Sequence, residues 1–279
     1  MLFPLKCVYR LKSFVLFGGY ICRLVVNRWW FDKLLAIVYF ALYKLSLIPV
    51  TIIQKQPVCK STQSFSYMPL VYQQNINPVT KLGVWHIGEP ENFFLLQVPL
   101  ERSITHPNKR LQHLAGRYLL QELYPEFPYS LIRIADTRKP FLENELYHFS
   151  ISHCGAYAAA IVSTGNRVGV DVELMTTKVT KVKHKFLSEK EQLMIDSLSL
   201  NKSIELYHQL LTTTWSIKES LYKWYGDNEV DFIEHLQIEQ INLNDNQGIA
   251  DCRFLKDAAI ELQVHFLWFN NNCVSWVVS

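Results

Sequence analysis

The chain has 279 residues, of which 49% are hydrophobic and 13% aromatic, with a formal net charge of +3. This length and apolar content allow a sizeable core, which excludes global disorder and permits one large domain or two small ones. The charge is unevenly spread. Residues 1–67 carry nine lysines and arginines against one acid, whereas the remainder carries 19 basic and 24 acidic side chains.

The leader, residues 1–67, is basic and apolar. Within it, residues 31–53 have about the length of a membrane span, but Lys44 falls near the middle, where a charge is costly. Three interpretations stay open: an imperfect membrane anchor, a basic segment lying on a membrane surface, or a stretch that precedes the natural start of the protein. We favour the third, with Met68 as the candidate start, because a domain-like pattern begins there.

The first part of the body alternates strand and helix patterns. Residues 81–88 and 92–100 are predicted as strands or strand-and-turn segments. Residues 106–124 carry leucines near helical spacing, which predicts a helix. Residues 130–142 favour an extended segment.

Three strand patterns follow closely, at residues 147–153, 157–163 and 167–174, separated by glycine-containing turns. They predict an antiparallel meander. In the third strand the valines share one face, and Asp171 and Glu173 share the other, about 7 Å apart along the strand.

Two helix patterns come next. Ser188 and Glu191 form a capping-box signature for a helix over 189–198. Residues 204–226 are the longest helical pattern and end at a glycine, a typical C-terminal cap. Further strand patterns begin at about residue 232.

Mixed strands and helices therefore occur twice. This predicts an α+β fold in two similar-sized halves, residues 68–165 and 166–279, each with a helix packed on a mostly antiparallel sheet.

The six cysteines form no C-x-x-C pair and no cluster with zinc-ligand spacing, which favours free thiols in a reducing cytoplasm. Cys154 follows His153 directly. Neighbours on a strand point to opposite faces, so the two make a poor nucleophile–base pair.

Three acids recur at spacings that suit a divalent cation. Taken singly, Asp171 and Glu173 are explained as the solvent face of a strand, and Glu219 and Lys223 as an i,i+4 helix ion pair. Together, the three carboxylates can supply oxygen ligands to Mg²⁺. The stretch WSIKESLYK places Lys218, Glu219 and Lys223 within two turns, so that Lys223 could neutralise a nearby phosphate.

Several separate cations would suit a polyphosphate ligand: Lys109, Arg110, Arg138, Lys139 and His153. Each alone is ordinary charged surface, or in the case of the histidine a structural residue. A mildly acidic body with local cationic positions suits a small phosphorylated substrate better than a long nucleic acid.

The blocks HFSISH, GVDVE and WSIKESLYK, in this order, resemble the signature of the 4′-phosphopantetheinyl transferases, in particular the larger single-chain bacterial type. The segment RKP at 138–140 and the run FLSEKE at 186–191 extend the resemblance, which covers most of residues 68–279. Ser150, Cys154 and Arg138 depart from the Asn, small hydroxyl residue and Gly that are common in this family.

The resemblance implies a monomeric pseudo-dimer of two α+β halves with the active site in the cleft between them. It implies that the phosphopantetheine arm of coenzyme A moves to a serine of an acyl- or peptidyl-carrier protein, with release of 3′,5′-ADP. It places the carrier-binding surface near residues 180–205 and predicts no nucleic-acid partner.

The resemblance also assigns roles to residues. Mg²⁺ would be held by Asp171, Glu173 and Glu219, and Lys223 would stabilise charge on the pyrophosphate. The coenzyme would be bound by Asp171 and Lys223 together with Lys109, Arg110, Arg138, Lys139, Ser152 and His153. The general base stays open among Glu219, Glu173 and a metal-bound water.

Two other functions stay open. A metal-dependent nuclease also uses acids followed by a Glu/Lys set, although usually as Glu-x-Lys on a strand. A membrane-attached adaptor would use residues 31–53 as its anchor and the acids as plain surface.

Overall fold

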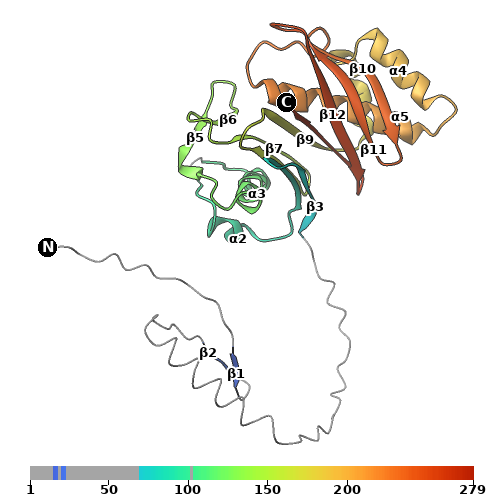
Figure 1. The fold of residues 1–279 in the computed structure, drawn as a ribbon. Coiled ribbons are helices and arrows are strands. Elements are labelled where there is room, and N and C mark those ends of the chain that lie inside the picture. The colour runs from blue at the N-terminus through green and yellow to red at the C-terminus, as the bar shows by residue number, and fades with distance from the viewer. Residues whose placement is uncertain (1–14, 18–19, 23–68, 101–102) are drawn as a thin grey trace, which may run out of the picture. The chain divides into compact units, whose positions relative to one another are not determined.

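The computed structural model describes residues 15–17, 20–22, 69–100 and 103–279 (Figure 1). The strands β1 (Val15–Phe17) and β2 (Tyr20–Cys22) pair as an antiparallel hairpin in one compact unit, and all later elements belong to a second. The predicted anchor at 31–53 and the candidate start Met68 lie outside the described residues. Within these residues, no helix has the length and apolar character needed to cross a membrane.

The first half of the second unit is a four-stranded antiparallel sheet covered by a helix. The sheet order is β3-β4-β8-β7, and α3 lies against it (Figure 1). The elements are β3 (Leu70–Asn77), β4 (Thr80–His86), α2 (Glu91–Leu95), α3 (Pro107–Leu123), the short hairpin strands β5 (Ile132–Ile134) and β6 (Pro140–Leu142), β7 (His148–Cys154) and β8 (Tyr157–Ser163).

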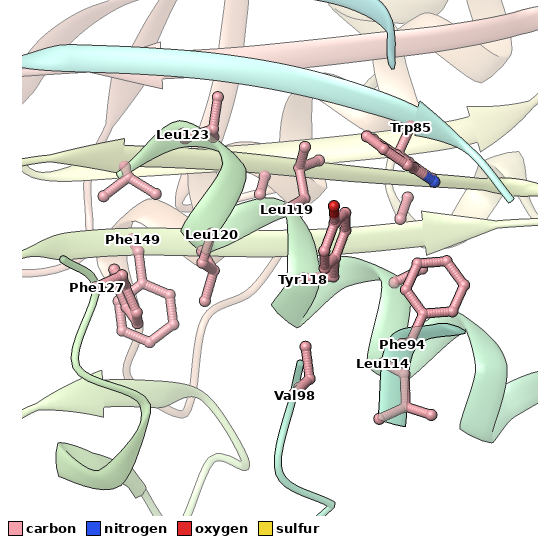
Figure 2. Packing of buried hydrophobic residues seen from close by; sticks show 14 of the residues in the cluster. Trp85, Phe94, Val98, Leu114, Tyr118, Leu119, Leu120, Leu123, Phe127 and Phe149 are labelled. Carbon is pink, nitrogen blue, oxygen red and sulfur yellow. The ribbon is translucent and has the colours of Figure 1, made fainter. Parts of the chain in front are cut away.

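The leucine pattern that predicts a helix over 106–124 is confirmed by α3. Pro107 occupies its first turn, where the missing N–H costs no hydrogen bond. The helix buries one face in an aromatic cluster, in which Tyr118 packs edge-on to Trp85 and Phe94 (Figure 2).

The strand prediction over 92–100 is wrong, because this stretch begins in the helix α2. A short apolar run does not by itself distinguish a strand from a buried helix. Pro90 takes the extended N-cap conformation and starts the turn. Phe94 and Val98, four residues apart, are then both buried on the same side against α3.

The second half is a five-stranded antiparallel sheet of order β10-β11-β12-β13-β9, with α4 and α5 beside it (Figure 1). The elements are β9 (Val168–Leu174), two short 3₁₀ turns (Thr177–Lys181 and Lys183–Lys185), α4 (Glu189–Ser199), α5 (Ile204–Tyr225), β10 (Leu236–Asn244), β11 (Gln247–Phe254), β12 (Ile260–Phe269) and β13 (Asn272–Val278).

Both predicted helix ends of this half are confirmed. The Ser188 side chain accepts from the Glu191 backbone N–H while the Glu191 side chain accepts from the Ser188 N–H, which completes the capping box of α4. Gly226 ends α5 in the left-handed conformation, with φ 81°.

The α+β architecture with antiparallel sheets is as predicted. That the two halves are structural repeats of one another stays a prediction. The two sheets share a buried core formed by Leu82, Val84, Ala159 and Ile161 of the first sheet and Val168, Val170, Val172, Val274 and Trp276 of the second. The predicted valine face of β9 is therefore the face that joins the halves.

The opposite face of β9, which carries the acids, lies against α5. Gly169 makes this close approach possible: a Cβ atom there would lie 2.1 Å from the carbonyl oxygen of Ser220 and 2.7 Å from the backbone nitrogen of Trp224. Asp171 and Glu173 consequently point towards the helix that carries Glu219 and Lys223.

Candidate active site

Asp171 is the centre of the candidate site and is almost fully buried, with 2% of its surface exposed. Its Oδ1 accepts hydrogen bonds from Ser152 Oγ at 2.8 Å and from Lys223 Nζ at 2.6 Å. Lys223 also donates to Ser152 Oγ at 2.8 Å. Asp171 Oδ2 is buried and has no hydrogen-bond partner among the described residues. One carboxylate oxygen is thus left for a ligand.

Glu173 has a protein donor on each of its oxygens. Trp215 Nε1 donates to Oε1 at 3.3 Å, and Cys154 Sγ donates to Oε2 at 3.3 Å. Burial raises the pKa of Glu173, and the nearby charge of Asp171 raises it further. Burial also raises the pKa of Cys154 to about 11, so at neutral pH the thiol keeps its proton and can donate.

Glu219 is within electrostatic reach of both strand acids. Burial raises its pKa to about 7, and the charges of Asp171 and Glu173 act in the same direction, while Lys223 opposes them. Across the described ranges, no three His, Cys, Asp or Glu side chains lie close enough to form a metal site as they stand. The ligand set of the sequence analysis therefore stays a prediction.

The chemistry of these residues nevertheless fits a divalent cation. The donors are carboxylate oxygens, which Mg²⁺ prefers. One of them, Asp171 Oδ2, is buried without a partner among the described residues, and burial together with the charges of neighbouring acids raises the pKa values of Glu173 and Glu219. A cation between the acids would relieve that repulsion.

His153 lies near two of the predicted cations. Its side chain is exposed, but partial desolvation by its neighbours lowers its pKa, and the charges of Lys223 and Lys109 lower it further, whereas Asp171 acts in the opposite direction. The structure thus brings Lys109, on α3, towards the β7 strand that carries Ser152 and His153.

Arg110 is occupied elsewhere. Its guanidinium forms a two-point pair with Glu91, at 2.7 and 2.8 Å, and also donates to the Ile104 carbonyl at 3.0 Å. These contacts hold α2 and its following loop to the start of α3. The phosphate contact assigned to Arg110 by the resemblance stays a prediction, and this pair would have to be exchanged for it.

Arg138 and Lys139 line a cavity of about 210 Å³ between the β5–β6 turn, β7 and the C-terminal end of α5, where Tyr222, Lys223 and Gly226 also contribute. Burial lowers the pKa of Lys139 to about 8, and the charge of Arg167 contributes. Arg138 has a left-handed backbone, with φ 66°. A cationic cavity therefore lies next to the acidic cluster, with Lys223 common to both.

Three residues have roles that the sequence does not indicate. Lys218 is fully buried and donates to Glu191 at 2.8 Å and to the Phe186 carbonyl at 2.6 Å, so it belongs to the structure of the half and not to the site. Trp215 and Cys154 contact Glu173. The alternation of Ser150, Ser152 and Cys154 on one face of β7 is the signal that could have placed Cys154 beside the acids.

Comparisons with known proteins fit this arrangement. Residues 167–277 match the family model of the 4′-phosphopantetheinyl transferase superfamily. The chain is 30% identical over 113 residues to the 4′-phosphopantetheinyl transferase gsp of Aneurinibacillus migulanus, covering 40% of this chain and 45% of that protein.

Two further relatives carry the name enterobactin synthase component D. The protein of Shigella flexneri is 32% identical over 143 residues, or 48% of this chain and 66% of its own length. The protein of Salmonella typhi is 31% identical over 122 residues, or 43% and 49%. The chain thus spans between 45% and 66% of the length of these three relatives.

Proposed function

We propose that the chain moves the phosphopantetheine arm of coenzyme A to a serine of an acyl- or peptidyl-carrier protein, because residues 167–277 match the family model of the 4′-phosphopantetheinyl transferase superfamily. The observation that carries this proposal is the junction of β9 and α5. There a buried carboxylate with one unpartnered oxygen, Asp171, lies beside Glu219 and a cavity lined by cations.

Asp171, Glu173 and Glu219 would hold Mg²⁺, and Asp171 Oδ2 would be available to it without the loss of any hydrogen bond in the described part of the chain. When bound, the ion neutralises charge on the pyrophosphate of coenzyme A.

The remaining residues bind and orient the donor. Arg138 and Lys139 line the cavity, and Lys109 and His153 would add positive charge or N–H donors for the phosphates. Lys223 lines the cavity and also donates to Asp171. Its ammonium can therefore stabilise the negative charge that develops on the leaving 3′,5′-ADP.

A serine hydroxyl needs a base when it attacks the β-phosphorus. The base stays open among Glu219, Glu173 and a metal-bound water, because a cation held by Glu219 would lower the pKa that burial raises to about 7. The serine Oγ forms the new P–O bond, its proton passes to this base, and the bond between the β-phosphorus and the oxygen of the leaving 3′,5′-ADP breaks.

The carrier protein would dock on the segment from the first 3₁₀ turn to the start of α5. This segment exposes Leu193, Leu200 and Ile204, each at least 67% accessible. It also carries lysines at 178, 181, 183 and 185. A surface that combines apolar and basic side chains suits a partner with an acidic rim around apolar residues.

The proposed compartment is a reducing cytoplasm. Cys154, Cys252 and Cys273 are free among the described residues, which suits such a compartment.

The nuclease alternative loses its support, because Glu219 and Lys223 lie on the helix α5 and not on a strand.

The test is mass spectrometry of an apo-carrier protein after incubation with the full chain, coenzyme A and Mg²⁺. We expect a carrier adduct with the mass of phosphopantetheine, together with 3′,5′-ADP. If several acyl- and peptidyl-carriers stay unmodified while labelled DNA is cleaved, the proposal fails in favour of the nuclease.

A further inference from the structure

The carboxylate of Glu173 is held from two sides by different elements. Trp215, from α5, donates its indole N–H to Oε1, and Cys154, from β7, donates its thiol to Oε2, both at 3.3 Å. Asp171 differs, since both of its donors meet on Oδ1 and Oδ2 has none in the described part of the chain. Glu173 is thus oriented through both of its oxygens.

Cys154 also links the Glu173 carboxylate to the backbone of β9, the strand that carries Glu173. Its sulfur accepts from the Leu174 N–H at 3.3 Å while its S–H reaches Glu173. It is the third member of a row on β7: Ser150 Oγ accepts from the Val170 N–H at 3.1 Å, and Ser152 Oγ donates to Asp171. Each member of the row contacts β9, and the last two each contact an acid of the site.

The indole of Trp215 cannot easily turn away. Its ring is stacked on Phe232, with centroids 5.5 Å apart and an interplanar angle of 24°, and meets Phe186 edge-on at 5.2 Å. With the ring fixed between these two neighbours, the direction of its N–H bond is fixed as well.

We propose that Cys154 and Trp215 are positioning residues, a two-donor clamp that holds Glu173 in place as a ligand for a divalent cation. Neither residue needs to touch the ion. They hold the carboxylate in a fixed orientation against the repulsion of the other acids, as partners of metal ligands do elsewhere. The inference rests on the proposed function only for the identity of Glu173 as a ligand.

The probe is Mn²⁺ alone, whose binding to the full chain is followed by electron paramagnetic resonance without any turnover. Cys154→Ala removes one donor, and Trp215→Phe removes the other while keeping an aromatic ring between Phe186 and Phe232. We expect each variant to weaken Mn²⁺ binding about tenfold. Cys154→Ser keeps a donor and an acceptor at this position and should restore binding to within about twofold of the wild type.

Two matched controls separate the clamp from general loss of packing. Cys252→Ala removes a buried thiol that faces the Ala250 carbonyl. Trp85→Phe removes an indole N–H that donates to the Glu89 carboxylate at 3.1 Å in the core of the first half. Both substitutions are of the same kind but lie away from Asp171, Glu173 and Glu219, and both should leave the Mn²⁺ affinity unchanged.

Unchanged Mn²⁺ affinity in both Cys154→Ala and Trp215→Phe, with folding verified by circular dichroism, would overturn the clamp. So would a wild-type chain that binds no Mn²⁺. If the wild type binds Mn²⁺, both variants bind it weakly and no carrier protein is modified, then the clamp stands and the proposed transfer reaction is what fails.

Discussion

Among the described residues, Asp171 combines a hydrogen-bonded oxygen and an unpartnered one in a single buried side chain. Substitution by Asn keeps the size and can still accept from Ser152 and Lys223, but removes the charge that a cation needs. We expect Asp171→Asn to lower the rate of phosphopantetheine transfer by about 10²–10³-fold, the size typical of a lost electrostatic contact to the transition state. The rate is measured by mass spectrometry of the carrier.

A matched control for this variant is Asp251→Asn on β11. Its carboxylate accepts from Gln263 and Asn242 at the protein surface, and it should transfer at the wild-type rate. Equal loss of activity in both variants would indicate general damage and not a role for Asp171.

The raised pKa of Glu219 predicts that the free energy of unfolding depends on pH. Its pKa rises from 4.5 to about 7 on folding, so between these values the folded chain keeps a proton that the unfolded chain releases. The stabilisation is present below pH 4.5 and is lost as the pH rises through about 7, and it amounts to at most about 3 kcal/mol. In EDTA, urea unfolding at pH 5 and pH 8 should show this loss.

Two comparisons test the assignment of that loss to Glu219. Glu219→Gln should reduce the difference between pH 5 and pH 8, because the amide does not titrate. Mg²⁺ added at pH 8 should restore stability to the wild type but not to the variant. A pH profile that is identical in wild type and variant would contradict the raised pKa.

Substitution of Arg138 by glycine should have opposite effects on the stability of the fold and on the binding of 3′,5′-ADP. Its φ of 66° is costly for a residue with a Cβ, so Arg138→Gly should leave the free energy of unfolding unchanged or raise it by up to about 1 kcal/mol. The same variant removes a cation from the cavity and should weaken 3′,5′-ADP binding about tenfold, as measured by calorimetry.

Glu145 supplies the control for Arg138. It also has a left-handed backbone, with φ 50°, and is exposed outside the cavity lining. Glu145→Gly should relieve similar strain without any change in 3′,5′-ADP affinity. Weaker binding in both variants would mean that the loop and not the guanidinium is responsible.

The helix α5 is anchored by a buried ion pair. Lys218 and Glu191 are 0% and 2% exposed in their side chains and lie 2.8 Å apart. Glu191 also accepts from the Ile238 N–H, so the pair joins α5, α4 and β10. Lys218→Met leaves a buried carboxylate without its cation and should lower the free energy of unfolding by about 3–5 kcal/mol.

A double variant distinguishes the pair from simple packing. Lys218→Met combined with Glu191→Gln removes both charges and keeps the cap acceptor of α4, so it should recover part of the loss seen in urea unfolding. A double variant no more stable than the single one would show that the charge left on Glu191 is not the cause.

At the level of helices and strands, local patterns predicted those elements whose signals lie in neighbouring residues. The caps at Ser188 and Gly226, the leucine face of α3 and the two faces of β9 depend on spacing alone and are confirmed. The stretch 92–100 failed, because its apolar run fits a strand as well as the helix α2, and only packing against α3 decides between them.

Contacts between distant residues set the limit of the sequence analysis at the site. The partner of Lys218 lies 27 residues away, and Trp215 and Cys154 lie 42 and 19 residues from Glu173. No spacing rule connects such pairs. The sequence thus pointed to residues of the site, but it could not tell that Arg110 is paired with Glu91 or that Cys154 contacts an acid.

Considered as a whole, the second unit joins its halves in two ways. Apolar side chains fill the space between the two sheets, while β7 and β9 are linked by side chains at the border of the acidic cluster. The candidate site thus takes residues from both halves, with Ser152, His153 and Lys139 from the first and the acids and Lys223 from the second. Neither half alone carries the complete set.

The close contact at Gly169 makes this arrangement sensitive to a change that removes no charged group. An alanine there would force α5 away from β9 by its collision with the Ser220 carbonyl. Asp171 and Glu173 lie on β9 and Glu219 lies on α5, so this displacement would separate their carboxylates. A random-mutagenesis screen for inactive clones should therefore return substitutions at Gly169 together with substitutions at the acids.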